Sequence, residues 1–252
     1  MVRVIMHGCN GVMGQVITGM AKDMEGLTIV AGIDLKNDKE NGYPVYASLE
    51  ECKEEADAVV DFASPKAADH LMDFCAEKKL GLVLCTTGLS EEQIKKVKET
   101  AEKTAVLRSA NMSLGVNLLL KLVQEAAKVL ASSGFDIEIV EKHHNQKKDA
   151  PSGTALALAE SMNEALGNQS HYVYDRSSVH EKRDPKEIGI ASVRGGSIVG
   201  DHDVIFAGKD EVITFNHTAY SKAIFAKGAL EAAKFLAGKE PGLYDMSDVV
   251  QL

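Results

Sequence analysis

Strand-like and helix-like patterns of hydrophobic positions alternate along roughly the first 110 residues of the chain. Continuous apolar runs, typical of strands buried on both faces, lie at Val2–Met6, Leu27–Ile33, Ala58–Phe62, Leu82–Cys85 and Ala105–Leu107. Helical spacing or a helix-start motif follows in three places, at Val12–Met20, at Ala67–Ala76 and from Ser90 to about Thr104. This alternation predicts a doubly wound, Rossmann-like α/β domain with a parallel sheet.

The pattern changes in the second half of the chain. Long helical spacing appears at Val116–Ala131, Ala155–Leu166 and Ala223–Leu236, and strand-like runs appear at Ile137–Val140, Ile188–Val193, Ile198–Phe206 and Glu211–Ala219. Consecutive strands with short connections predict an α+β domain with a mostly antiparallel or mixed sheet. We therefore expect one domain made of residues 1–113 and 222–252 and a second made of residues 114–221, with the last helix packed back on the first domain.

Composition narrows the possible classes of function. The net charge is −9, which argues against a general affinity for nucleic acid or an anionic membrane, although Lys142, Lys147 and Lys148 could form a local basic pocket. No apolar run approaches the length of a membrane span. The four cysteines form no C-x-x-C motif, which predicts free thiols and a cytoplasmic protein.

A glycine-rich turn lies between the first predicted strand and the first predicted helix. Gly8, Gly11 and Gly14 would let the backbone approach a pyrophosphate, with the helix N-terminus supplying N–H donors. The second strand ends at Asp34, twenty residues past Gly14, where a carboxylate can accept hydrogen bonds from ribose hydroxyls. The spacing favours a dinucleotide site over the alternative, a structural turn with Asp34 as a solvated acid.

Asp34 also bears on the choice of cofactor. Its carboxylate repels a 2′-phosphate and favours NADH, whereas Lys36 lies close enough to neutralise that phosphate. We expect use of NADH, NADPH or both, with a lean towards NADH.

The segment Glu141–Ala155 concentrates groups suited to a small dianionic substrate that gains a proton. It contains adjacent histidines, His143 and His144, which point opposite ways in an extended backbone, so only one of them easily faces a cofactor. A histidine proton is available near neutral pH, which makes this side chain the natural general acid.

Cationic and backbone donors follow in the same segment. Lys147 supplies a cation for a carboxylate, and Pro151-Ser152-Gly153-Thr154 predicts a helix start whose first N–H groups could bind a second carboxylate oxygen. Taken alone, a solvated charged loop is an equal alternative. A metal site is not expected, because the segment lacks cysteine and no other histidine has ligand spacing. The remaining histidines are scattered, and we expect most of them to be structural or exposed.

Together these motifs resemble the 4-hydroxy-tetrahydrodipicolinate reductase (dihydrodipicolinate reductase) family over essentially the whole chain. The family pattern E-x-H-H-x-x-K-x-D-x-P-S-G-T-A runs without a gap from Glu141 to Ala155. Supporting matches are Gly8-x-x-Gly11-x-Met13-Gly14, Asp61-Phe62 followed by Pro65, Thr86-Thr87-Gly88, the run Ala110–Asn117, Val193-Arg194 and Gly242–Met246.

The resemblance implies an NAD(P)H-dependent oxidoreductase of the diaminopimelate and lysine pathway, in which hydride reaches C4 of a small dicarboxylate and water is lost. It implies a dinucleotide-binding first domain and a second domain for substrate binding and assembly into a homotetramer. The implied catalytic residues are His143, as general acid, and Lys147. The implied substrate contacts are His144, Lys147, Ser152, Gly153 and Thr154. The implied cofactor contacts are Gly8, Gly11, Val12, Met13, Gly14, Asp34, Lys36, Phe62, Thr86, Thr87, Gly88, Ala110, Asn111 and Met112.

The chain departs from the family pattern at a few positions. Some members carry arginines that suit a 2′-phosphate where this chain has Val12 and Leu35, which argues against a strong preference for NADPH. Cys85 replaces a usual glycine, and Lys222 stands where arginine is common. Two other hypotheses are a dinucleotide sensor without turnover and a reductase for another small keto or imino acid. The intact Glu141–Ala155 segment argues against both.

Overall fold

The computed structural model describes residues 1–250, which form two compact units. The first unit comprises Met1–Leu114 and the C-terminal segment from Ala223, and the second comprises Gly115–Lys222. Each unit has its own sheet and its own hydrophobic core.

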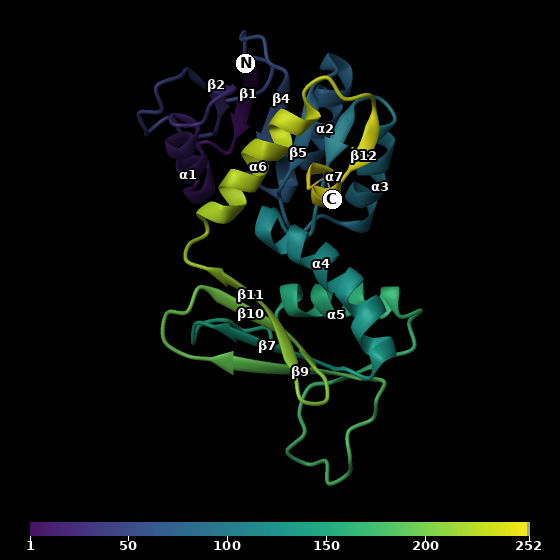
Figure 1. Cartoon of the computed structure of the whole chain (residues 1–252). Coiled ribbons are helices and arrows are strands. Elements are labelled where there is room, and N and C mark those ends of the chain that lie inside the picture. Colours follow the sequence, from purple (N-terminus) through teal and green to yellow (C-terminus); the bar gives the residue numbers. More distant parts are fainter. Residues whose placement is uncertain (251–252) are drawn as a thin grey trace. The chain divides into compact units, whose positions relative to one another are not determined.

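The first unit is built on a seven-stranded parallel sheet in the order β12-β6-β5-β4-β1-β2-β3 (Figure 1). Its strands are β1 (Val2–His7), β2 (Leu27–Ile33), β3 (Val45–Tyr46), β4 (Ala58–Asp61), β5 (Gly81–Leu84), β6 (Ala105–Leu107) and β12 (Gly242–Tyr244). The chain leaves β1 towards β2 and later returns to pair β4 on its other side. This reversal creates a crevice at the carboxyl ends of β1 and β4, where such sheets bind ligands.

Helices cover both faces of this sheet. They are α1 (Val12–Ala21), α2 (Pro65–Lys78), α3 (Glu91–Ala101), α6 (Ala223–Leu236) and the short α7 (Met246–Val249). Side chains alternate along β1, so Val4 and Met6 pack in the core with α1 and α6, whereas Ile5 packs in the core with α2 and α3. The predicted doubly wound architecture is confirmed, and α3 begins with the predicted capping box of Ser90 and Gln93.

The second unit has a five-stranded mixed sheet in the order β11-β10-β7-β9-β8. Its elements are α4 (Leu114–Leu130), the 3-10 helix η1 (Ala131–Ser133), β7 (Asp136–His143), α5 (Gly153–Ala165), β8 (His171–Val173), β9 (Glu187–Arg194), β10 (Gly200–Ala207) and β11 (Val212–Ala219). The β10 strand is antiparallel to β7 and β11, whereas β9 is parallel to β7 and β8. One face of the sheet packs against α4 and α5, as Figure 1 shows.

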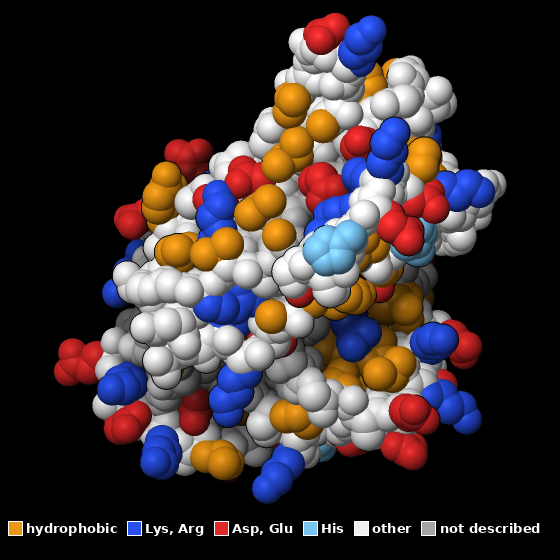
Figure 2. Space-filling model, turned by 90° about the horizontal axis from the view of Figure 1, so that it is seen from below, with side chains coloured by type: hydrophobic (Ala, Val, Ile, Leu, Met, Phe, Trp, Pro, Cys, Tyr) orange, Lys and Arg blue, Asp and Glu red, His pale blue; other side chains and the backbone are white. Residues whose placement is uncertain are grey.

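The other face of this sheet carries charged pairs between apolar side chains, and Figure 2 shows the second unit from this side. The Lys142 ammonium contacts Asp201 at 2.8 Å and Asp203 at 2.7 Å, so Lys142 lies on the face away from His143 and does not belong to a basic pocket with Lys147. The hypothesis that it does was wrong because residues 142 and 143 alternate across an extended strand.

Candidate active site

A glycine turn connects β1 to α1. Gly8 has a φ of +83°, a conformation that favours glycine, and its N–H donates to the carbonyl of Ile33 at 2.8 Å. Gly11 caps α1, and a Cβ at Gly14 would lie only 2.2 Å from the Gly8 carbonyl oxygen. The helix therefore packs directly on the turn, which leaves its N-terminal N–H groups available to an anion.

Asp34 is tied to this turn and is not a freely solvated acid. Its Oδ2 accepts from the backbone N–H of Asn10 at 3.0 Å, and its Oδ1 accepts from the N–H of Lys36 at 3.3 Å. The carboxylate thus links the end of β2 to the glycine turn. Beside it, Val12 is 82 % and Leu35 91 % exposed, where some family members carry arginine.

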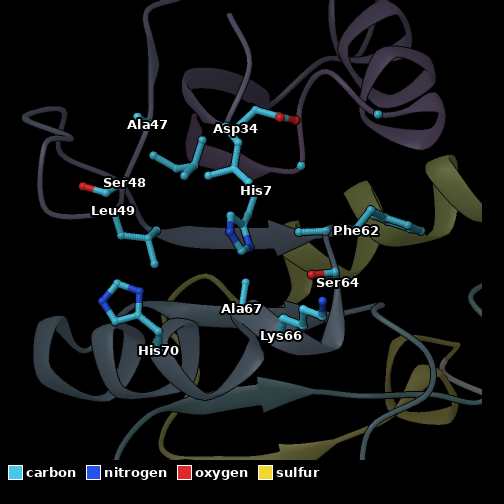
Figure 3. Close-up of a pocket in the computed structure, with 15 residues that line it drawn as sticks. His7, Asp34, Ala47, Ser48, Leu49, Phe62, Ser64, Lys66, Ala67 and His70 are labelled. Atoms are coloured by element: carbon cyan, nitrogen blue, oxygen red, sulfur yellow. The ribbon is translucent and has the colours of Figure 1, made fainter.

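A pocket of about 490 Å³ opens at the carboxyl ends of β1, β2 and β4 (Figure 3). It is lined by four of the predicted cofactor residues, Gly8, Gly11, Asp34 and Phe62. The other ten lie elsewhere in the first unit. Those are Val12, Met13, Gly14, Lys36, Thr86, Thr87, Gly88, Ala110, Asn111 and Met112. Of these, Met112 is 5 % exposed and contributes its side chain to the core, so a cofactor contact would fall to its backbone.

Three residues of this pocket with basic side chains, His7, Lys66 and His70, were not predicted from the sequence. His7 lies in the middle of the pocket, between Asp34 and the helix α2 that carries Lys66 and His70 (Figure 3). Its Nδ1 contacts Oδ1 of the buried Asp61 at 2.7 Å. The available signal was that His7 and Asp61 are polar residues at the ends of two apolar strands.

In the second unit, the helix-covered face of β7 ends in a buried polar pair. Ile137 and Ile139 pack in the core, and Glu141 and His143 continue the same row at residue period two. Glu141 is 0 % exposed and His143 is 8 % exposed. A buried carboxylate requires partners.

Glu141 has a full set of donors. His143 Nδ1 lies 2.5 Å from Glu141 Oε2, Arg194 contacts both carboxylate oxygens at 2.7 and 2.8 Å, and the Ser152 N–H donates at 3.1 Å. Burial alone would raise the pKa of Glu141, but hydrogen bonds from Arg194, Ser192 and His143 lower it to about 2. The ionised carboxylate accepts a hydrogen bond from Nδ1–H of His143. This leaves Nε2 of His143 available for proton transfer.

His202 joins this group, although it is one of the scattered histidines, most of which we expected to be structural or exposed. It faces Glu141 across β10 and β7, and its ring meets that of His143 edge-on at a centroid distance of 5.1 Å. Its Nε2 lies 3.0 Å from Ser152 Oγ. Burial, helped by the nearby His143, lowers the pKa of His202 to about 4, so His202 is neutral at neutral pH.

The predicted substrate contacts lie in the segment that follows β7. Ser152 caps α5, since its Oγ accepts from the N–H of Ala155 at 3.1 Å. Gly153 is the first residue of α5, and a Cβ built there would meet no atom within 4 Å, which leaves room near the first helical N–H groups of Gly153 and Thr154. Pro151 precedes the cap and does not occupy the first helical position.

Lys147 lies in a turn in which its N–H donates to the carbonyl of His144 at 3.1 Å. Its ammonium contacts Asp149 Oδ1 at 2.9 Å, and this pair lowers the pKa of Asp149. The Lys147 side chain is 21 % exposed and that of Asp149 is 59 % exposed. A substrate carboxylate could therefore replace Asp149, which water already reaches, as the partner of the Lys147 ammonium.

Within residues 1–250, no three His, Cys, Asp or Glu side chains gather in an arrangement that could hold a metal ion. In the same range, no helix is long and apolar enough to cross a membrane. All four cysteines are free thiols, and burial raises the pKa of the Cys9 thiol, under the glycine turn, to about 11.

Comparison with known proteins identifies relatives along the whole chain. Residues 2–112 match the family model described as dihydrodipicolinate reductase, N-terminus, and residues 115–250 match the model described as dihydrodipicolinate reductase, C-terminus. A protein of Caldanaerobacter subterraneus subsp. tengcongensis, named 4-hydroxy-tetrahydrodipicolinate reductase, is 55 % identical over 251 residues, covering 100 % of this chain and 99 % of the relative. A protein of Clostridium tetani with the same name is 48 % identical over 246 residues, covering 98 % of this chain and 96 % of the relative.

Solved structures agree with these matches. Dipicolinate-bound dihydrodipicolinate reductase from Paenisporosarcina sp. TG-14 has a TM-score of 0.83 and 26 % identity, covering 98 % of this chain and 99 % of that one. GenD2 from gentamicin A biosynthesis, solved in complex with NAD, has a TM-score of 0.57 at 12 % identity, covering 99 % of this chain and 90 % of that one, which is a likeness of fold alone.

Proposed function

Because the chain belongs to the dihydrodipicolinate reductase family, we propose that it reduces 4-hydroxy-tetrahydrodipicolinate to tetrahydrodipicolinate in the diaminopimelate route to lysine. The chain is an NAD(P)H-dependent oxidoreductase. The observation that supports this substrate is the buried Glu141–His143 pair beside the N-terminus of α5, because it combines a proton donor with backbone donors for a carboxylate.

The residues of the first unit suit a dinucleotide. The N–H groups at the start of α1 would hold the pyrophosphate, Asp34 would accept from the ribose, and the pocket lined by Phe62 and His70 has room for the adenosine end. The bound cofactor supplies the hydride. Around the nicotinamide we propose Thr86, Thr87 and Gly88 with residues 110–112, on the strength of the family pattern.

Asp34→Ser should change the cofactor preference. The carboxylate favours NADH and repels the 2′-phosphate of NADPH, and Val12 and Leu35 offer no compensating arginine. Its loss should weaken NADH and spare or improve NADPH, shifting the ratio of kcat/KM by roughly tenfold or more, since a charged hydrogen bond is worth about 1.5–3 kcal/mol.

Steady-state kinetics with both cofactors measure this shift. Asp34→Asn is the matched control for shape, because an amide oxygen can still accept from the Asn10 N–H while the charge is gone. An unchanged ratio in both variants would make Asp34 a purely structural link between β2 and the turn.

In the second unit, His143 donates a proton to the substrate as hydride arrives, and water is lost. The Nδ1–H of His143 is hydrogen-bonded to Glu141, so the proton that is transferred is the one on Nε2 of His143. Gly153, Thr154 and Ser152 at the start of α5, together with His144 and Lys147, would hold the two carboxylates of the substrate.

Lys147→Ala should weaken binding of pyridine-2,6-dicarboxylate and lower turnover, while the affinity for NADH stays near wild type. The reason is that Lys147 belongs to the second unit, and the dinucleotide residues belong to the first. Calorimetric titration with each ligand separates the two effects. Lys209→Ala, at an exposed lysine between β10 and β11 of the same unit, is the control. An equal loss of affinity for both ligands in Lys147→Ala would reject the assignment of Lys147 to the substrate site.

We further propose a homotetramer formed through the open face of the second sheet. On that face Val193 and Val212 are 46 % and 62 % exposed, which suits burial against another subunit. The four free thiols suit a reducing cytoplasm.

The proposed function is tested by a steady-state assay with enzymatically generated substrate and each cofactor. We expect substrate-dependent oxidation of NADH and of NADPH. Tight binding of NADH without turnover would instead identify a dinucleotide sensor, and turnover only with a different keto or imino acid would reassign the substrate.

A further inference from the structure

We propose that Arg194 is a positioning residue that, through Glu141, sets how readily His143 releases its proton; this inference rests on the proposed role of His143 as the general acid. Arg194 is the last residue of β9 and lies beside His143 in the parallel register of β7 and β9. Its guanidinium contacts the buried Glu141 carboxylate, which also contacts His143.

His143 and Arg194 contact the same carboxylate oxygen of Glu141. Glu141 Oε2 contacts His143 Nδ1 at 2.5 Å and Arg194 Nη1 at 2.8 Å, and Arg194 Nη2 contacts the other oxygen at 2.7 Å. Two further hydrogen bonds fix the Arg194 guanidinium, because Nη1 also donates to the Val193 carbonyl at 2.7 Å and Nη2 to the Asp149 carbonyl at 2.6 Å. The cation therefore has a fixed place against Glu141.

This arrangement places two opposite charges near His143. The Glu141 carboxylate favours the imidazolium form, and the Arg194 cation offsets that attraction. A carboxylate without such a cation beside it makes a neighbouring histidine a weaker proton donor. The Arg194 cation weakens the attraction between Glu141 and the imidazolium, so His143 can pass its proton to the substrate.

The other titratable groups around His143 leave this balance to Glu141 and Arg194. His202 on β10 is buried and neutral, and burial also lowers the pKa of His217 beyond it on β11. Lys147 and Asp149, in the segment after β7, neutralise each other as an ion pair. The Lys142 pairs lie on the opposite face of the sheet.

The test compares the pH dependence of kcat/KM in Arg194→Gln and Glu141→Gln. Activity requires protonated His143, so it falls as pH rises through the pKa of His143. Arg194→Gln should move this alkaline limb to higher pH, and Glu141→Gln should move it to lower pH, each by roughly one unit or more. Arg194→Lys, which keeps the charge but loses the fork, should leave the limb near wild type.

A merely structural role would lower the activity of both variants without moving the limb in opposite directions. Shifts of the same sign, or none, would overturn the proposal. If Arg194→Gln does not fold, histidine NMR titration of wild type and Glu141→Gln decides, with His143→Gln assigning the resonance. A His143 pKa that does not fall in Glu141→Gln would then reject the proposal. This titration needs no substrate, so its outcome is separate from that of the proposed function.

Discussion

Replacing His143 with Gln should lower kcat by about 10²–10⁴-fold while KM changes far less, because the substitution removes a proton donor that acts in the transition state. Gln can still donate a hydrogen bond towards Glu141, so the buried carboxylate is not abandoned. Steady-state kinetics at saturating NADH, with thermal unfolding to verify the fold, measure the effect.

His180→Gln is the matched control, since His180 is exposed in the connection between β8 and β9. It should leave both kinetic parameters unchanged. A His143→Gln protein with the wild-type kcat would remove His143 from the chemistry. It would leave the Glu141–Arg194 pair as a structural ion pair at the end of β7.

The second large effect is expected at the glycine turn, where Gly14→Ala should abolish tight binding of NADH. A Cβ at Gly14 would lie 2.2 Å from the Gly8 carbonyl oxygen and 2.6 Å from that of Cys9, so the turn or the helix must move. Overpacking of this kind costs about 1–3 kcal/mol, which corresponds to roughly a 5- to 150-fold rise in Kd for NADH if the turn gives way.

Gly19→Ala provides the control in the same helix. A Cβ at Gly19 meets no atom within 4 Å, and alanine is favoured over glycine in a helix interior by about 1 kcal/mol. This variant should bind NADH as the wild type does and unfold at the same or a higher temperature. Calorimetry with NADH compares the two proteins. Equal affinities would mean that the first turn of α1 does not approach the cofactor.

The fold was predictable where hydrophobic periodicity is long and unambiguous. The buried runs that became β1, β2, β4, β5 and β6 and the longer strands β7, β9, β10 and β11 of the second sheet were recognised from pattern alone. The strands β3, β8 and β12 were missed. They have only two or three residues each and lie at sheet edges, where a period-two pattern has no room to appear.

Helix starts were predicted less well than helices. The helix α2 begins at Pro65, two residues before the expected start at Ala67, whereas α5 begins at Gly153, inside the segment Pro151–Thr154 that predicted its start. At α5 the Ser152 side chain caps the helix, whereas at α2 Ser64 occupies the cap position without a side-chain hydrogen bond and Pro65 opens the first turn. Cap chemistry determines a helix start more directly than hydrophobicity does.

The candidate site could be predicted from the sequence only where its residues lie close together along the chain. The spacing of Glu141 and His143 already implies one face of one strand, continuing Ile137 and Ile139. His202 and Arg194 could not be found in this way. Their places depend on the pairing of β7 with β10 and with β9, and that register is set by the folded sheet, not by local sequence.

The most direct test of the account follows the hydride itself. The protein would be incubated with enzymatically generated 4-hydroxy-tetrahydrodipicolinate and NADH deuterated at the transferring position of the nicotinamide, and the product would be analysed by mass spectrometry and NMR. The account predicts tetrahydrodipicolinate that carries the deuterium at C4. Unlabelled product, label at another carbon, or no product while NADH remains bound would contradict it.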